Sequence, residues 1–228
     1  MLGIATGITN TSYQWQPNHV GADLKLWLRN GVGVAAAQWD DSSGNGNHAA
    51  QGTGGNQAAV SGGGLEFDGS DDHYDITEIV CSDREAFMFF IVIEPDNVST
   101  RVMLGDGTNE GLVEIQTNKR IRVKIDGDTA ISPTFSEVQF PAGEKYVLGI
   151  QREAGATGNI NVYKDGTLLT PTSQLADSGP IAFNSISGRG SDRYFDGHIY
   201  ELLFYDTADL TTGEIGKINN YLVNKHTL

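Results

Sequence analysis

The sequence predicts an all-β domain, a sandwich or a barrel of antiparallel strands, and two observations carry that prediction. About a dozen short apolar runs of strand length follow one another along the chain. Between them lie clusters of Gly, Asn, Asp and Pro, including Asp–Gly pairs, which supply the positive φ that tight hairpins need. The pairs begin at Asp68, Asp106, Asp126, Asp165 and Asp196. The runs cover residues 24–28, 65–67, 74–76, 87–93, 102–104, 112–115, 121–125, 138–140, 146–150, 160–163, 181–183 and 199–205.

The first apolar run follows a polar N-terminal segment. Leu24, Leu26 and Leu28 alternate with other residues, so we expect them on one face of a strand. Residues 1–20 are polar apart from apolar outliers such as Tyr13 and Trp15, and we interpret them as an N-terminal arm that packs on its own domain or on a partner. No internal repeat or linker is visible in the remainder, so residues 21–228 are expected to form a single domain.

One helix is predicted at the C-terminal end of the sequence. Thr211 and Glu214 have the spacing of a capping box. Ile215, Ile218 and Leu222 share one helical face, with Tyr221 beside them. The spacing predicts a helix over residues 212–224 that closes one side of the strand assembly.

Charge and composition exclude several classes of partner. The 228 residues have a net charge of −14, which argues against nucleic acid or an anionic membrane surface as the partner. Cys81 is the single cysteine, which excludes a disulfide framework within the chain. The longest apolar run covers residues 86–93, far short of the roughly 20 residues that a bilayer requires. The N-terminus also has no basic region followed by an apolar stretch, so no signal peptide is expected.

The segment 40–48 is rich in oxygen donors. Asp40, Asp41, Asn45 and Asn47 offer carboxylate and amide oxygens, and the neighbouring glycines expose backbone carbonyls. These are the ligands that calcium prefers, so the four residues form a candidate structural calcium site. The alternative is a series of Asx turns that brace a long loop.

A basic stripe stands out in this acidic chain. Arg120, Arg122 and Lys124 alternate with apolar residues, which places the three cations on one face of a strand. One interpretation is an ordinary solvent-exposed sheet face. The other is a contact with an acidic surface, on a second subunit or on an anionic glycan.

Catalytic motifs are not recognisable in the sequence. Glu66 and Asp68 alternate on a strand as in some glucanases, but Gly69 then turns the chain. Glu94 is followed by Pro95, which breaks that strand before a third acid can follow. Because glycosidases need two carboxyl groups facing one cleft, we expect a protein that is not an enzyme.

Several segments in a consistent order resemble one family of β-sandwich domains. The sequence FDGSDDHY at 67–74 is close to the FDG-x-DDY turn of the laminin-G-like, concanavalin A-like jelly-roll family. The resemblance extends from about residue 22 to residue 226. The other segments that carry it are 26–28, 39–47, 87–93, 161–166, 195–206 and 210–222.

The resemblance implies a jelly-roll sandwich of two curved antiparallel sheets that binds glycans or proteins on its concave face or its rim loops. It also supports calcium near residues 40–47, because members of the family often hold calcium at such a loop. It does not imply an activity, because the fold serves lectins, glycosidases and adhesion modules.

A stand-alone domain with a short aromatic arm resembles virion structural proteins of tailed bacteriophages. This implies a non-catalytic protein of the virion, assembled in the host cytoplasm, that decorates a capsid or belongs to a head or tail appendage. Tyr13, Trp15 and the stripe at Arg120, Arg122 and Lys124 would then dock on capsid proteins or on neighbouring subunits, for instance in a homotrimer.

The alternative function is a free, lectin-like carbohydrate-binding module. Trp15, Trp27 or Trp39 would stack on a sugar while polar loops bind its hydroxyl groups, or the latter two would be packed inside the sandwich. The two functions overlap if the protein is an appendage that binds a host glycan. A glycoside hydrolase is disfavoured by the broken acidic motifs.

Overall fold

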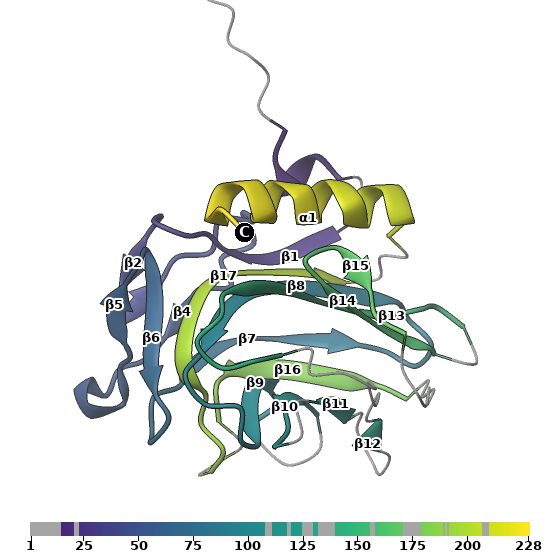
Figure 1. The fold of residues 1–228 in the computed structure, drawn as a ribbon. Helices are drawn as coiled ribbons and strands as arrows, with labels where there is room; N and C mark the ends of the chain where they lie inside the picture. Colours follow the sequence, from purple (N-terminus) through teal and green to yellow (C-terminus); the bar gives the residue numbers. More distant parts are fainter. Residues whose placement is uncertain are drawn as a thin grey trace, which may run out of the picture.

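The computed structural model confirms the predicted two-sheet antiparallel sandwich with a C-terminal helix (Figure 1). The helix lies on the outer side of one sheet, so the molecule has three layers. No helix among the described residues is long and apolar enough to cross a bilayer. The structure describes residues 15–20, 23–107, 111–117, 120–124, 130–131, 140–155, 158–170, 179–188, 190, 192–206 and 210–228.

Sheet A is the sheet next to the helix. Its strands follow the order β15-β14-β13-β8-β17-β6-β5, and β1 pairs with β17 beyond the end of β6. The strands are β1 (Asp23–Leu28), β5 (Ala59–Ser61), β6 (Gly64–Asp68), β8 (Phe87–Pro95), β13 (Tyr146–Arg152), β14 (Ile160–Lys164), β15 (Thr167–Leu168) and β17 (Asp196–Asp206).

Sheet B forms the other layer of the sandwich. Its strands follow the order β12-β11-β10-β9-β16-β7-β4-β3-β2, and every neighbouring pair is antiparallel. The strands are β2 (Val34–Ala35), β3 (Gln38–Trp39), β4 (Ala49–Ala50), β7 (Tyr74–Cys81), β9 (Arg101–Gly105), β10 (Leu112–Ile115), β11 (Ile121–Lys124), β12 (Ala130–Ile131) and β16 (Ile181–Ile186).

The central strand β8 shows why its sequence is apolar without a break. Side chains of a strand alternate between its two faces. Phe89 and Ile91 point into the core between the sheets, whereas Phe90 and Val92 point into a second core under the helix. Both faces of sheet A are therefore buried here, and an unbroken apolar run is the pattern of such a strand.

The helix α1 (Thr212–His226) begins where the capping box predicts and ends two residues later than predicted. The Thr211 hydroxyl accepts a hydrogen bond from the Glu214 N–H, and the Glu214 carboxylate accepts one from the Thr211 N–H. Ile218 and Leu222 are fully buried against sheet A. Burial of each such side chain stabilises the fold by about 2 kcal/mol. Short 3₁₀ turns, η1 (Pro17–His19) and η2 (Gly54–Asn56), complete the described helical elements.

A β-bulge in β1 corrects the prediction that Leu24, Leu26 and Leu28 share one face. Leu24 pairs with Tyr205 and Leu26 with Phe204, so Lys25 is an extra residue in the strand. Leu26 and Leu28 point into the core between the sheets, but Leu24 lies in the core under the helix. A single extra residue shifts the alternation by one, and the apolar pattern alone does not reveal it.

Candidate functional site

Two of the three tryptophans are structural. Trp39 lies in the core between the sheets and Trp27 lies under the helix, each with 1% of its surface exposed. The indole N–H of Trp39 donates to the Arg29 carbonyl oxygen at 3.2 Å. Both rings are therefore packed, and neither can stack on a sugar.

Trp15 is the tryptophan whose ring reaches the surface. It is half-buried and packs edge-to-face on Tyr221 of α1, with ring centroids 6.3 Å apart. The segment that carries it is anchored by the Tyr205 hydroxyl, which donates to the Pro17 carbonyl at 3.1 Å. Residues 15–20 therefore lie over their own domain. Tyr13, the other aromatic residue predicted to bind a partner, lies outside the described residues.

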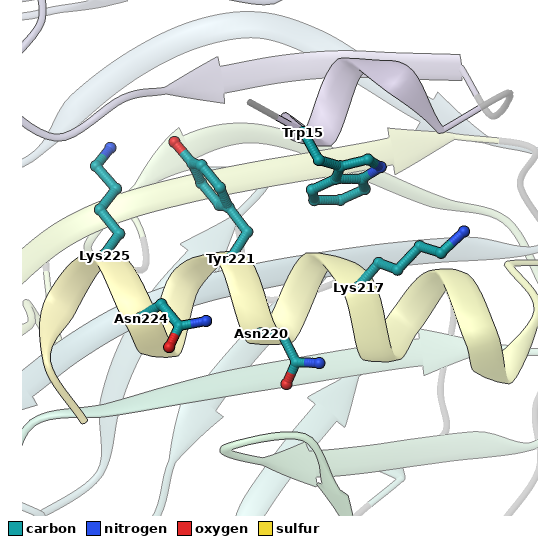
Figure 2. Close-up of a pocket in the computed structure, with 6 residues that line it drawn as sticks. All are labelled: Trp15, Lys217, Asn220, Tyr221, Asn224 and Lys225. Carbon is teal, nitrogen blue, oxygen red and sulfur yellow. The ribbon is translucent and has the colours of Figure 1, made fainter. Parts of the chain in front are cut away.

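Trp15 and α1 enclose an open pocket with a volume of about 540 Å³. Figure 2 shows the Trp15 ring over one flank of the helix between Tyr221 and Lys217, whereas Asn220 and Asn224 project from the other edge of the helix. Lys217, Tyr221 and Lys225 are spaced i, i+4, i+8, and Asn220 and Asn224 form a parallel row, so the lining follows from helical periodicity. The lining residues are Trp15, Lys217, Asn220, Tyr221, Asn224 and Lys225.

A buried carboxylate pairs with Lys225, one of the residues that line this pocket. The Glu201 side chain of β17 is fully buried, and its oxygens lie 2.8 Å from the Trp27 indole nitrogen, 2.8 Å from the His226 Nε2 and 2.7 Å from the Lys225 Nζ. Burial alone would raise the pKa of the Glu201 carboxyl, but these three partners outweigh it and the pKa is lowered. Glu201 is therefore a carboxylate that holds the C-terminal turn of α1 in place.

The pocket combines apolar ring surface with polar side chains. Trp15 and Tyr221 offer apolar ring surface, and the exposed amides of Asn220 and Asn224 offer donors and acceptors for hydroxyl groups. Burial raises the pKa of the Tyr221 hydroxyl to about 12, so this group stays protonated and can donate a hydrogen bond. None of the described residues that line the pocket carries a carboxylate, whereas glycosidases need two.

Sequence reasoning found only part of this pocket. Trp15 was identified as a partner-binding residue, and Tyr221 was placed at the margin of the helical apolar face. Asn220, Asn224 and Lys217 were missed because polar residues on the outer face of a helix are ordinary. Only the position of Trp15 above that face distinguishes them, and it depends on the tertiary fold.

The basic stripe lies on β11 and beside it. Ile121 and Val123 are buried in the core, and Arg122 and Lys124 point to the other side, as the alternation predicts. Arg122 forms a salt bridge at 3.0 Å with Glu114, whose side chain is fully buried. A second salt bridge at 3.0 Å joins Glu114 to Arg193, which lies outside the stripe.

Arg122 is therefore partly neutralised by a neighbouring strand. Arg120 stands just before β11, where it lines a separate small pocket. Partner binding by Arg120, Arg122 and Lys124 stays a prediction.

The loop predicted to bind calcium is built as a brace for β1. Each oxygen of the Asp41 carboxylate accepts two hydrogen bonds: one oxygen from the Trp27 and Ser43 N–H groups, the other from the Ser43 hydroxyl and the Asn47 N–H. Asn45 and Asn47 direct their amide NH₂ groups at the carbonyl of the bulged Lys25.

This arrangement does not fit a calcium ion, because donors rather than free oxygens converge in the loop. Asp40, the fourth predicted ligand, accepts instead from the Gln38 side chain at 2.6 Å. The loop matches the alternative of Asx turns, and it covers the free edge of β1.

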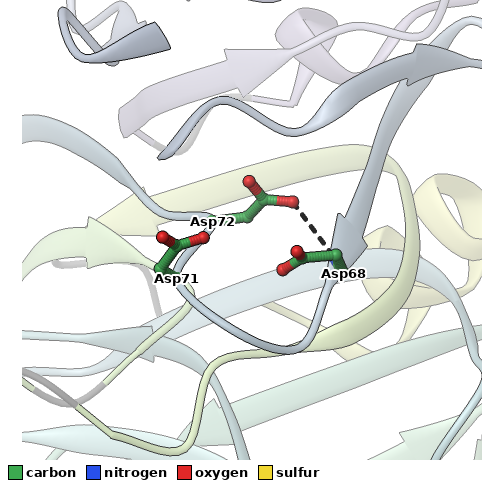
Figure 3. A group of neighbouring side chains, drawn as sticks. All are labelled: Asp68, Asp71 and Asp72. Atoms are coloured by element: carbon green, nitrogen blue, oxygen red, sulfur yellow. Dashed lines mark hydrogen bonds between the residues drawn. The ribbon is translucent and has the colours of Figure 1, made fainter. Parts of the chain in front are cut away.

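The turn after β6 gathers three carboxylates. Oxygens of Asp68, Asp71 and Asp72 lie within 4.8 Å of one another (Figure 3). The Asp72 carboxylate accepts a hydrogen bond from the Asp68 N–H at 3.0 Å. Burial and the two neighbouring carboxylates raise the pKa of Asp72. The cluster closes a tight turn and borders a pocket lined also by Glu66, Asp96 and Asp196.

Glu66 and Glu94, which the sequence separates, lie on either side of His198 across three strands. Glu66 lies 3.2 Å from the His198 Nε2, and Glu94 accepts a hydrogen bond from the Tyr200 hydroxyl at 3.0 Å. Both acids are thus engaged with side chains of β17. Glu94 is not among the residues that line the acidic pocket.

Comparison with known proteins was made by sequence and by structure. No protein-family model and no curated protein sequence matches this chain. Among solved structures, domain 4 of AbnA, a GH43 extracellular arabinanase from Geobacillus stearothermophilus in complex with arabinotriose, has a TM-score of 0.56 and 17% identity. The match covers 87% of this chain and 98% of that domain.

Two other similar structures are parts of larger chains. A Trypanosoma rangeli sialidase has a TM-score of 0.61 at 17% identity over 88% of this chain, and this chain spans only 33% of the sialidase. The binding domain of Paraclostridial Mosquitocidal Protein 1 has a TM-score of 0.61 at 15% identity, over 92% of this chain and 54% of that one. At these identities the likeness shows the fold alone: this chain is a jelly-roll β-sandwich.

Proposed function

We propose that this protein is a non-catalytic carbohydrate-binding module and that the pocket between Trp15 and α1 is its binding site. The observation that carries the proposal is the composition of that pocket. A half-exposed tryptophan and a tyrosine lie beside two exposed asparagine amides, with no carboxylate among the lining residues. Small-molecule sites combine such apolar surface with a few convergent polar groups.

The size of the pocket suits a short oligosaccharide. A volume of about 540 Å³ falls within the usual range for ligand sites, about 300–1,000 Å³. Lys217 and Lys225 are two helical turns apart, a distance of about 12 Å along the axis, which accommodates two or three sugar rings. The Trp15 ring would stack on one of them while the two amides bind hydroxyl groups.

One of the similar structures, the arabinanase domain, supports the proposal. The arabinanase domain aligns over nearly its whole length, and its structure contains a bound arabinotriose. That finding concerns the arabinanase. It makes arabinan oligomers a reasonable first ligand for this chain.

Alanine substitutions in the pocket test the proposal. On a glycan array that includes arabinan oligomers, we expect the wild type to bind and N220A/N224A to lose binding at least about ten-fold. Because Ala favours a helix over Asn by several tenths of a kcal/mol, N220A/N224A should be slightly more stable than the wild type. A loss of binding therefore cannot be ascribed to unfolding.

Two further variants locate the site on the correct face. Trp15→Ala should also lose binding. Tyr194→Ala removes another half-buried aromatic ring, one that packs on His73 far from α1, and should bind as the wild type does. Unchanged binding by N220A/N224A and Trp15→Ala would refute the pocket assignment.

A role in a virion is the second proposal, and the basic stripe favours it. Arg122 and Lys124 point away from the core on β11 and Arg120 stands just before it, in a protein with a net charge of −14. If this face docks on an acidic capsid or appendage protein, the R120E/K124E variant should fail to join particles while retaining its fold. Normal incorporation of that variant would contradict docking by the stripe.

A further inference from the structure

The α1 pocket is the exception to the acidic character of the chain. Within the described part of the chain its lining contains two lysines and no carboxylate, although the net charge of the protein is −14. The acidic pocket near β6 has the opposite character. Its lining includes the carboxylates of Glu66, Asp68, Asp72, Asp96 and Asp196.

The two lysines of the α1 pocket differ in how much charge they offer to a ligand. The Lys225 Nζ lies 2.7 Å from the buried Glu201 carboxylate, so its charge is compensated. Lys217 is exposed and forms no salt bridge with any described residue. Glu214, one turn earlier, turns its carboxylate to the Thr211 N–H and hydroxyl, at 2.9 and 2.7 Å. Lys217 thus presents an available ammonium group beside Trp15 (Figure 2).

We propose that this pocket selects an anionic sugar, one that carries a carboxylate or a sulfate, and that Lys217 is the residue that recognises the negative charge. This inference rests on the proposed function and adds the class of ligand to it. Trp15, Asn220 and Asn224 supply affinity for the sugar ring whatever its charge. Lys217 supplies the preference for the charged form, because it is the exposed lysine of the lining and forms no salt bridge with a described residue. The Glu214 carboxylate interacts with it electrostatically, but is hydrogen-bonded to Thr211.

The expected preference is modest and depends on salt. An exposed ion pair contributes little in water, so the charged sugar should bind about five-fold more tightly than an uncharged analogue of the same shape. The Debye length falls from about 10 Å at 0.1 M salt to about 3 Å at 1 M. The ratio of the affinities for the charged and the uncharged sugar should therefore fall towards one at high salt. The part of the affinity that is due to stacking should persist.

Isothermal titration calorimetry on the full chain tests the inference with matched ligands. Trigalacturonate and its fully methyl-esterified form have the same rings and differ in charge. A sulfated galactobiose and its unsulfated form make a second pair, which distinguishes sulfate from carboxylate as the preferred group. The matched protein variants are Lys217→Gln and Lys124→Gln, the latter in the basic stripe.

The inference predicts tighter binding of the charged member in at least one pair, lost in Lys217→Gln and retained in Lys124→Gln. The affinity for the uncharged member should stay the same in Lys217→Gln. Equal affinities within both pairs would overturn the charge selection and leave the carbohydrate-binding proposal standing. If the preference disappears in Lys124→Gln instead, the anion binds at the stripe and the inference is wrong. No binding of any of the four ligands would overturn the charge selection, and the glycan array would then decide the carbohydrate-binding proposal separately.

Discussion

A single side chain, that of Glu201, connects strands β17 and β1 with the C-terminal end of α1. It accepts a hydrogen bond from Trp27 of β1 and lies within 2.8 Å of Lys225 and His226 at the end of α1. Burial of a carboxylate without partners would cost several kcal/mol of folding free energy. Here Trp27, Lys225 and His226 all contact the carboxylate oxygens and offset that cost. The pair formed with Lys225 also holds in place one of the residues that line the α1 pocket.

Removal of the Glu201 charge should destabilise the protein. We expect Glu201→Gln to lower the free energy of unfolding by about 3 kcal/mol, because it leaves the Lys225 ammonium without its counter-charge. Urea denaturation measures this value. The double variant E201Q/K225M should recover part of the loss, and equal stabilities of the wild type and Glu201→Gln would contradict the buried pair.

The pH dependence of stability gives an independent test of the same residue. The pKa of Glu201 lies below its ordinary value of 4.5, so its ionised form stabilises the folded state. This contribution is fully present above about pH 4.5 and is lost as the pH falls through the lowered pKa. The wild type should therefore lose stability below pH 4.5 more steeply than Glu201→Gln does. The difference between the two proteins cancels other acids such as Asp72, whose raised pKa acts in the opposite sense.

Asp41 holds the loop that follows β3 against strand β1. Its carboxylate accepts four hydrogen bonds. We expect Asp41→Ala to lower the free energy of unfolding by about 2–3 kcal/mol, since four part-buried donors lose their acceptor. Millimolar calcium should leave the thermal midpoint of the wild type unchanged. A rise that is abolished in Asp41→Asn would show instead that the loop binds calcium.

At the scale of elements, α1 is held by its cap, by its apolar face and by a hairpin. The turn between β14 and β15 contains Gly166, and a Cβ at this position would collide with the Asn219 amide of α1. The hairpin therefore approaches the helix as closely as a glycine allows. Together with Trp15 on the other flank, it fixes the position of the helix over sheet A.

Two glycine substitutions distinguish helix propensity from packing. Gly216 lies in the middle of α1 and a Cβ there would meet no atom within 4 Å, so Gly216→Ala should stabilise the protein by about 1 kcal/mol. Gly166→Ala should destabilise it, because the φ of +79° and the contact with Asn219 both oppose a side chain. Thermal denaturation checks both. A stability loss in Gly216→Ala would show that α1 is strained at this point.

Elements with a local signal were predictable from the sequence, and elements set by tertiary contacts were not. The capping box at Thr211 and Glu214 defined the start of α1, because both partners lie within one turn. The bulge at Lys25 was missed because its cause is remote. Asn45 and Asn47 donate hydrogen bonds to the carbonyl oxygen of Lys25, the extra residue. These residues are 20 and 22 positions away in the sequence, so no local pattern predicts the contact.

At the scale of the whole molecule, three layers place sequence-distant residues side by side. Trp15 and Tyr221 come from opposite ends of the chain and meet over sheet A. The sequence indicated that Trp15 needs a partner surface, yet it could not indicate that α1 provides it. The candidate site was therefore predictable only in part, because its second half consists of ordinary polar positions on a helix.

The most direct test of the central claim is an NMR titration of ¹⁵N-labelled protein with an oligosaccharide that the glycan array identifies. We expect saturable shifts of the Trp15 indole N–H and of the side-chain amides of Asn220 and Asn224. The backbone amides of β11 should stay unchanged. Shifts confined to Arg122, Lys124 and their neighbours, with Trp15 unaffected, would contradict the account and place the binding site on sheet B.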